Sequence, residues 1–345
     1  MKLAIEIGSA QPDTLKLTTE WVQLADRLGV DMAFSAEAWW SDAVTPLAYL
    51  ADKTERITLA TGIMQMTART PAMTAMTALT LHDLTGGRFA LGLGASGPQV
   101  VEGLHGVRYK MPLTRLRETV EICRMIFAGE KVSYEGKVFQ LPLPDSEGKS
   151  IRIAHEPVDI PVYLATLGPN ALRFTGAAAN GWLGTSFSPD HPEAHMDYLA
   201  AGATDAGRSL QEVDLCVSVR VEIGDDVEAM IERRKQGVAF NIGGMGSETT
   251  NFYNDAFKRA GYEEDARAIQ SLWIAGKRDA AAQRVPDAMV TEFQALGTRE
   301  MVKERLRKYR EVGVTTLKLG LDSAGPIGPK RFALLENIVD LVEGL

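Results

Sequence analysis

Residues 71–95, PAMTAMTALTLHDLTGGRFALGLGA, place a helix directly before a buried strand. Pro71 suits the first turn of a helix, where its missing N–H needs no acceptor, and the helix is predicted to continue to Leu84. Phe89–Ala95 is a short and mostly apolar run. Such a run is typical of a parallel strand that is covered on both faces. A helix-and-strand unit of this kind predicts an α/β fold.

The same unit recurs along nearly the whole chain. Seven further short strands are predicted, at Lys2–Gly8, Met32–Glu37, Ile57–Met64, Val162–Leu167, Trp182–Ser186, Leu215–Ile223 and Thr316–Leu321. Most of the strands precede a helical stretch, such as Thr14–Leu28 or Leu113–Phe127. An open, doubly wound sheet is compatible with eight strands, but a closed (β/α)8 TIM barrel fits the count better and leaves no exposed edge. The active site of such a barrel is expected at the carboxyl ends of its strands.

We expect residues 1–345 to form one barrel domain with insertions at about 130–150 and 241–285. In the first insertion, Lys131–Leu141 alternates around Glu135-Gly136 and predicts a hairpin. The second, Asn241–Val285, is predicted to form polar helices that cap the barrel or pack on a partner subunit. No strand is predicted between Met230 and Leu296.

Composition limits the possible partners. Hydrophobic residues make up 45% and charged residues 24% of the 345, the usual balance of a globular protein. The net charge of -8 gives no reason to expect nucleic acid or an anionic membrane as a partner. The chain shows neither a signal-peptide pattern nor an apolar run long enough to span a bilayer, so a cytoplasmic protein is expected. Cys123 and Cys216 are too few for a disulfide framework and are expected to be buried thiols.

Gly92-Leu93-Gly94-Ala95-Ser96-Gly97 formally matches the dinucleotide-binding pattern GxGxxG. That motif requires a helix opening on the glycines and an acidic residue at the end of the next strand, about twenty residues on. Here Pro98 follows, and Met111–Arg117 predicts the start of a helix. The glycines are better explained as room for a flat ligand to lie against the backbone.

Two other strand ends suggest ligand contacts. Gly62, inside the run Thr61-Gly62-Ile63, indicates either an ordinary strand end or a bulge at which the backbone approaches a ligand. Thr166-Leu167-Gly168-Pro169-Asn170 leads from a strand into a helix. The free N–H groups and dipole of such a helix start can bind a phosphate, although any strand–helix turn shares this geometry.

The end of the second strand carries Glu37, with Trp39 and Trp40 behind it. A carboxylate among aromatic side chains is either a general acid or an anchor for a ring, or simply a loop residue beside two packing tryptophans. The five histidines show no metal-ligand spacing, so no metal site is expected.

At these positions the chain resembles the bacterial luciferase-like monooxygenase superfamily, and within it the branch that uses the deazaflavin coenzyme F420. The resemblance covers nearly the whole chain. It is carried by Thr61-Gly62-Ile63, Arg69-Thr70-Pro71, Leu84–Phe89, Leu91–Gly94, Gly168-Pro169-Asn170 and the stretch from Gly297-Thr298 to Gly313–Thr316. The choice of F420 over FMN rests on the stretch at Gly94–Val100 and on the IGGMG sequence in the second insertion.

The resemblance implies a (β/α)8 barrel with insertions, commonly a homodimer, that binds its cofactor at the carboxyl ends of the strands. A bulge in the third strand, here Thr61, Gly62 and Ile63 and often with a non-proline cis peptide, would back the central ring. Ser96 and Gly97 would contact the ring or its ribityl chain. The phosphate end would be held by Thr166, Leu167, Gly168, Pro169 and Asn170. Glu37, Trp39 and Trp40 would shape the substrate side, with Glu37 as a proton donor or acceptor.

The chain also departs from this branch. In the deazaflavin-dependent sugar-phosphate and alcohol dehydrogenases, a histidine follows the acid of the second strand, but here Ala38 follows Glu37. Those enzymes also place a glutamate after the fourth strand, where this chain has Ser96-Gly97-Pro98-Gln99. Their proton-transfer residues therefore cannot be carried over, and neither can their reactions.

The sequence predicts an F420-dependent oxidoreductase that transfers a hydride between the deazaflavin and a small organic substrate. One alternative keeps the fold and uses FMN as a monooxygenase. Another is a flavin- or deazaflavin-binding protein without turnover. A barrel hydrolase or aldolase is disfavoured, because the chain lacks clustered metal ligands and a recognisable nucleophile.

Overall fold

The computed structural model describes residues 1–8, 13–37 and 40–345. Within them, eight parallel strands close in the order β1-β2-β3-β5-β8-β9-β10-β12, and β12 returns to β1. The strands are β1 (Lys2–Glu6), β2 (Met32–Ser35), β3 (Thr58–Thr61), β5 (Phe89–Gly94), β8 (Val162–Ala165), β9 (Gly181–Gly184), β10 (Asp214–Ile223) and β12 (Thr316–Gly320). The predicted TIM barrel is confirmed, and the open sheet is excluded because β9 pairs with β10.

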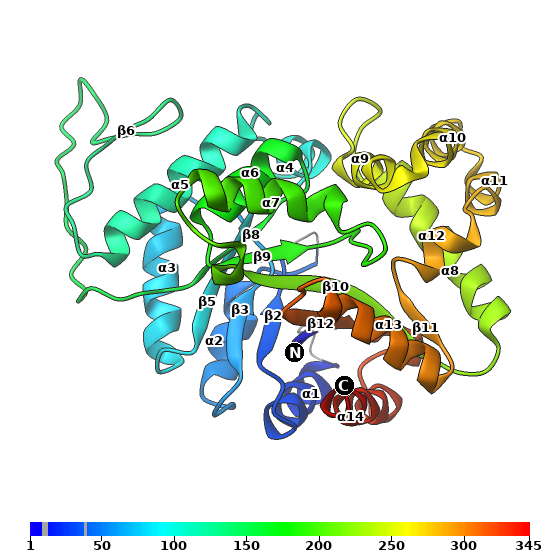
Figure 1. The fold of residues 1–345 in the computed structure, drawn as a ribbon. Coiled ribbons are helices and arrows are strands. Elements are labelled where there is room, and N and C mark those ends of the chain that lie inside the picture. The colour runs from blue at the N-terminus through cyan, green and yellow to red at the C-terminus, as the bar shows by residue number, and fades with distance from the viewer. Residues whose placement is uncertain (9–12, 38–39) are drawn as a thin grey trace.

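Helices surround the barrel (Figure 1). They are α1 (Leu15–Arg27), α2 (Val44–Ala51), α3 (Pro71–Leu84), α5 (Pro112–Phe127), α6 (Pro169–Ala178), α7 (Glu193–Asp205), α13 (Arg299–Glu311) and α14 (Pro329–Glu343). The start of α3 shows why the sequence folds this way locally: the Thr70 side chain accepts a hydrogen bond from the Met73 N–H, and Pro71 occupies the first turn.

Apolar side chains fill the barrel in two layers. Between strands and helices lies a large core that includes Ile5, Leu59 and Leu91. A smaller core fills the interior of the barrel. Its buried members are Ala4, Met32, Phe34, Ala60, Ala90, Tyr163, Leu183 and Cys216. Because this layer closes the interior, a ligand can enter only above it, toward the carboxyl ends. Cys123 and Cys216 are both buried free thiols, as predicted.

The first insertion forms the predicted hairpin, with β6 (Tyr134–Glu135) antiparallel to β7 (Gln140–Leu141). The buried Glu118 of α5 holds its turn, because the carboxylate accepts hydrogen bonds from the N–H groups of Lys137, Val138 and Phe139. In Figure 1 the hairpin extends from the left edge of the molecule, away from the second insertion.

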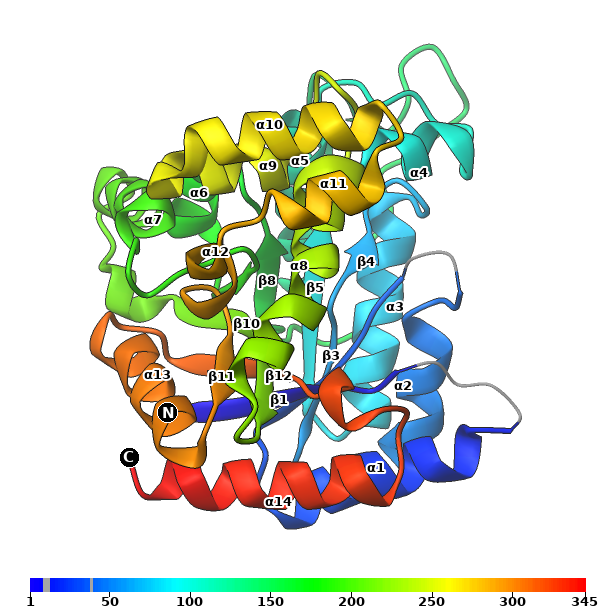
Figure 2. The same cartoon turned by 90° about the vertical axis from the view of Figure 1, so that its right-hand side faces the viewer.

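The second insertion has its own apolar core, which includes Ala239, Phe257 and Met289. Its helices extend beyond the predicted bounds of 241–285 and are α8 (Val227–Gly244), α9 (Phe252–Phe257), α10 (Glu263–Ile274), α11 (Arg278–Gln283) and α12 (Asp287–Thr291), with a kink at Ala260 and Gly261 between α9 and α10. Figure 2 shows α9, α10 and α11 above the barrel, opposite α1 and α14. Arg259 fastens the insertion by donating to the carbonyls of Leu167 and Ala194.

Two short strands differ from the predictions. The expectation of no strand between Met230 and Leu296 is wrong at its end, because Ala295–Gly297 forms β11 and pairs with β10. Three residues are too short for periodicity to reveal, and tertiary pairing defines the strand. Ile57–Met64 is not one strand either: β3 ends at Thr61, and β4 (Met64–Gln65) pairs separately with β5.

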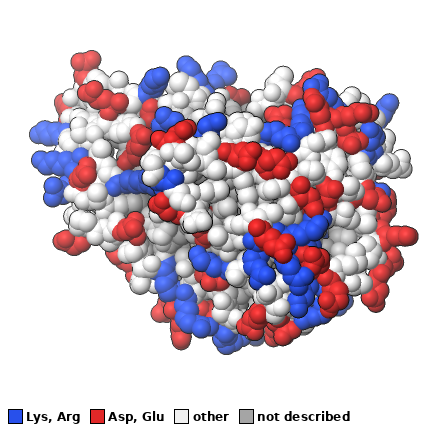
Figure 3. Space-filling model, in the orientation of Figure 1, with Lys and Arg blue, Asp and Glu red and all other residues white. Residues whose placement is uncertain are grey.

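The surface and the helices give two further observations. Figure 3 shows basic and acidic side chains interspersed over the face presented there. In the described part of the chain, no helix has the length and apolar character needed to cross a membrane.

Candidate cofactor and substrate site

The break between β3 and β4 is a bulge with a cis peptide between Gly62 and Ile63. Its backbone is held by strand β2 and the residues after it, because the Gly62 N–H donates to the Ser35 carbonyl at 2.6 Å and the Ile63 carbonyl accepts from the Glu37 N–H at 2.9 Å. A Cβ atom on Gly62 would lie 2.7 Å from Cδ1 of Phe34. Glycine is therefore the residue that fits here.

On the side of the bulge that faces β5, the side chain of Thr61 takes the place of the interrupted backbone hydrogen bonds. Its hydroxyl donates to the Gly92 carbonyl and accepts from the Gly92 N–H, both at 2.8 Å. A Cβ on Gly92 would lie 1.9 Å from the Thr61 carbonyl oxygen, and one on Gly94 would lie 2.5 Å from Cδ1 of Ile63. The expectation that these glycines make room for a ligand is thus only part of the explanation. Their first role is to let the bulge press against β5.

Glu37 lies 7% exposed behind the bulge, with partners on both carboxylate oxygens. Oε1 is 2.5 Å from Nη1 of Arg69, and Oε2 accepts from the Gln65 N–H at 2.8 Å. These contacts join the end of β2 to β4. The arrangement favours Glu37 as an anchor of the bulge over the proton donor or acceptor that the sequence suggested.

Ser96 and Gly97 follow β5 and line the same cavity as the bulge. Ser96 has a left-handed backbone (φ 57°), and its carbonyl accepts from the Tyr109 hydroxyl at 3.2 Å. Gly97 precedes a helix of six residues, α4 (Pro98–Gly103). The GxGxxG match at Gly92–Gly97 does not form a dinucleotide site, because the helix after it, α4, is too short.

The start of α6 borders the cavity next to these residues, because β8, which leads into α6, is the neighbour of β5 in the barrel. Gly168 is its N-cap and Pro169 its first residue, so the first-turn N–H groups of Asn170 and Ala171 lie at the helix end without intrahelical acceptors. Thr166 braces this turn from behind: its hydroxyl lies 2.7 Å from that of Thr175, and its carbonyl accepts from Trp182. The Thr166 hydroxyl is therefore already engaged within the protein.

These elements surround one large cavity of about 1140 Å³ at the carboxyl ends of the strands. Of the residues predicted for the site, the ones that line it are Glu37, Trp40, Gly62, Ile63, Ser96, Gly97, Thr166, Leu167, Gly168, Pro169 and Asn170. Thr61 is fully buried behind it. Trp40 is 54% exposed at its edge. Trp39, like Ala38, lies outside the described residues. Phe252, Tyr253 and Phe257 of the second insertion cover the cavity, as the cap prediction expects.

An ion pair on the cavity floor, between the largely buried Lys318 and the more exposed Glu6, is missing from the sequence predictions. Glu6 ends β1, and its Oε1 lies 3.0 Å from Nζ of Lys318 in β12. The charge of Lys318 holds the pKa of Glu6 below its ordinary value. Burial works against the ammonium, but Glu6 outweighs it and raises the pKa of Lys318. Both groups are therefore charged at neutral pH.

Tyr253 of α9 lies within the electrostatic reach of this pair. Burial raises the pKa of the Tyr253 hydroxyl, and the charge of Lys318 works in the opposite direction. A signal for the pair was present in the sequence, because Lys318 is a cation inside the apolar strand TLKLG. Its partner could not be identified, since Glu6 lies at the other end of the chain. Across the described residues, no group of three or more His, Cys, Asp and Glu side chains could hold a metal ion.

A closed parallel barrel, a bulged third strand and a capped cavity at the carboxyl ends define a TIM-barrel enzyme of the luciferase-like type. The model of the family "Luciferase-like monooxygenase" matches residues 2–316, and the chain belongs to this family. The predicted membership is confirmed, and the chain is an oxidoreductase.

Curated relatives and solved structures agree with this assignment. The chain is 37% identical over 335 residues to a Mycobacterium tuberculosis protein named "Putative coenzyme F420-dependent oxidoreductase", covering 94% of this chain and 96% of that one. It is 29% identical to the 5,10-methylenetetrahydromethanopterin reductase of Archaeoglobus fulgidus, covering 96% and 95%. The structure of the coenzyme F420-dependent tetrahydromethanopterin reductase of Methanopyrus kandleri matches with a TM-score of 0.77 and 26% identity, covering 99% and 98%.

Proposed function

We propose that the protein transfers a hydride between coenzyme F420 and a small organic substrate in the cavity above the barrel. The observation that carries the proposal is the meeting of the Gly62–Ile63 bulge and the start of α6 in one cavity. Relatives named for F420 along nearly the full length support the choice of cofactor.

The cavity fits a group of this kind. Its volume of about 1140 Å³ exceeds the range of about 300–1,000 Å³ usual for drug-sized ligands, which leaves space for a cofactor and a substrate together. Gly62, Gly94 and Gly97 line the cavity, so a flat ring can lie against the backbone there. At the start of α6, Gly168 has only Phe252 within 4 Å of its would-be Cβ.

Each part of the chain has a role in this proposal. F420 supplies a carbon that gives or takes a hydride, the two-electron step. The backbone of Gly62 and Ile63 backs the ring, and Thr61 and Glu37 hold that backbone in place. The N–H groups of Asn170 and Ala171, with the dipole of α6, bind the phosphate.

The proton that accompanies the hydride is assigned to the floor of the cavity. Lys318 Nζ carries a proton at neutral pH and lies in the cavity lining, where it can donate to a substrate oxygen or nitrogen as negative charge develops on it. Glu6 keeps the ammonium charged and oriented from 3.0 Å. The cap of Phe252, Tyr253 and Phe257 limits the access of water.

Cofactor titration tests the proposal. Purified protein freed of cofactor is titrated separately with F420 and with FMN, and the fluorescence of each is followed. We expect micromolar binding of F420 and weaker binding of FMN. Micromolar FMN binding without F420 binding would overturn the proposal in favour of the FMN monooxygenase.

Turnover is tested separately from binding. The reduced cofactor is mixed with the protein and a panel of enones, ketones, imines and nitroaromatics, and its oxidation is followed at the visible band. Acceptor-dependent oxidation is expected for at least one class. F420 binding with no oxidation by any class would favour the carrier protein without turnover.

A further inference from the structure

We infer that the substrate end of the cavity binds a carboxylate, or an anionic group of similar shape, through Arg220 with the help of Gln294. The inference rests on the proposed function and narrows its substrates to organic anions.

Arg220 stands one layer above the ion pair of the cavity floor. In the parallel pairing of β10 with β12, Ser218 is opposite Lys318 and Arg220 is opposite Gly320. Residues two apart on a strand share a face, so Arg220 points to the same side as Ser218, and both line the cavity. A Cβ on Gly320 would lie 3.2 Å from Arg220 Cγ. The glycine thus leaves the space that the arginine stem uses.

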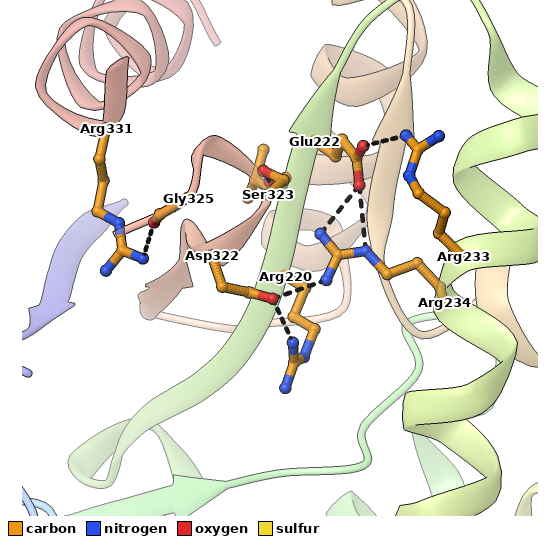
Figure 4. Close-up of polar contacts among 9 residues, drawn as sticks. Arg220, Glu222, Arg233, Arg234, Asp322, Ser323, Gly325 and Arg331 are labelled. Carbon is orange, nitrogen blue, oxygen red and sulfur yellow. Dashed lines mark hydrogen bonds and ion pairs between the residues drawn. The ribbon is translucent and has the colours of Figure 1, made fainter. Parts of the chain in front are cut away.

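A chain of ion pairs fixes the guanidinium (Figure 4). Asp322 Oδ2 lies 2.7 Å from Nη1 of Arg220 and 2.9 Å from Nη1 of Arg234. Arg234 also pairs with Glu222, whose other oxygen binds Arg233. Since an arginine has five N–H donors and 51% of the Arg220 side chain is exposed, donors remain for a ligand in the cavity.

The charges at this end favour an anion. The network that holds Arg220 joins three arginines, Arg220, Arg233 and Arg234, to only two carboxylates, Glu222 and Asp322. Burial would raise the pKa of Asp322, but Arg220 and Arg234 outweigh it and lower the value. Even with every carboxylate ionised, the group therefore has an excess of positive charge.

The side chain of Gln294 gives independent evidence for a ligand at this position. Because Ala295 of β11 is opposite Val221 of β10, the preceding Gln294 lies beside Arg220. It lines the cavity and is 8% exposed, and its Oε1 has no hydrogen-bond partner among the described residues. Buried polar atoms are rarely left without partners. The side-chain NH2 of Gln294 also lacks a partner within the described part of the chain and, unlike Oε1, is not enclosed, so it can donate to an anion beside the guanidinium, and the two planar groups suit a carboxylate.

Benzoate and its neutral analogue benzamide test the subsite on the F420-loaded protein by calorimetry. We expect the wild type to bind benzoate more tightly, and Arg220→Gln to weaken benzoate binding by about 10- to 100-fold, the value of a charge-assisted contact, with benzamide binding unchanged. The matched control is Arg233→Gln, which removes a cation at the outer end of the same network and should keep the preference. Arg220→Lys keeps the charge without the planar fork and should reduce benzoate affinity by a smaller factor.

Equal binding of benzoate and benzamide by the wild type, or an intact preference in Arg220→Gln, would overturn the inference. So would a loss of F420 affinity in Arg220→Gln, measured by deazaflavin fluorescence, because Arg220 would then hold the cofactor's own anionic tail. A wild type that binds no F420 contradicts the proposed function instead. F420 binding without a carboxylate preference contradicts only the present inference.

Discussion

Thr61→Val is the substitution that most sharply separates the bulge from an ordinary strand end. Valine has nearly the shape of threonine, so packing in this fully buried position is preserved. It removes the hydroxyl that both accepts from the Gly92 N–H and donates to the Gly92 carbonyl, each at 2.8 Å. The substitution therefore leaves two buried backbone groups of Gly92 without partners.

The expected magnitude follows from those two groups. An unsatisfied buried donor or acceptor costs about 1–3 kcal/mol, so the loss of partners for two such groups in Thr61→Val should lower the free energy of unfolding by roughly 2–6 kcal/mol. Thr61→Ser is the matched control, because it keeps the hydroxyl and loses one methyl group, worth about 1 kcal/mol. Against a total stability of about 5–15 kcal/mol, the difference between the variants is measurable.

Urea denaturation of both variants gives the comparison, with the midpoints read at an unchanged slope. The affinity for F420, measured by fluorescence, should fall further in Thr61→Val than in Thr61→Ser, because the bulge loses its support from β5. Equal stability of the two variants, within about 0.5 kcal/mol, would refute the reasoning. It would mean that the reciprocal hydrogen bonds do not hold the bulge.

Three further predictions concern the site and the amino-terminal end of the barrel. Gly62→Val should abolish detectable F420 binding in the fluorescence titration. The control Gly237→Ala, on a helix with open space around it, should leave binding unchanged. Retained F420 affinity in Gly62→Val would contradict the bulge assignment. Glu6→Gln should lower the melting temperature at pH 7. The difference from wild type should disappear as the pH falls below about 4.5, because the Glu6 carboxylate, whose pKa is lowered in the folded protein, stabilises the fold only while it is ionised. A difference that does not depend on pH would show that the pair with Lys318 contributes nothing to stability. Arg88→Lys should lower the free energy of unfolding, measured by urea denaturation, by about 2–3 kcal/mol. The guanidinium donates to three backbone carbonyls that one ammonium cannot all reach. A loss of less than about 0.5 kcal/mol would contradict this prediction.

The barrel could be predicted because its signals are local. Pro71 and the Thr70 cap begin α3, and the apolar run from Phe89 that forms β5 can be recognised in the sequence alone. The length of the chain and the alternation of strands with helices then leave few possible folds. The interruption of the third strand could be predicted only in part. Gly62 shows where the strand is interrupted, but the contacts of the bulge with Phe34, Glu37 and Gly92 determine its geometry.

The chemistry of the site was harder to predict, because its partners are distant in sequence. Glu37 looks like a free acid at a strand end, and only the fold brings Arg69 to it. Glu6 and Lys318 meet because β1 and β12 are neighbours in the closed barrel, although more than 300 residues separate them. Single-residue patterns do not contain such pairings.

The crystal structure of the protein with F420 bound is the most direct test of the central claim. We expect the deazaflavin ring against the Gly62–Ile63 peptide, its phosphate at the first-turn N–H groups of Asn170 and Ala171, and Lys318 on the opposite side of the ring, toward the substrate. A ring bound away from the bulge, or a phosphate bound away from the start of α6, would contradict the account.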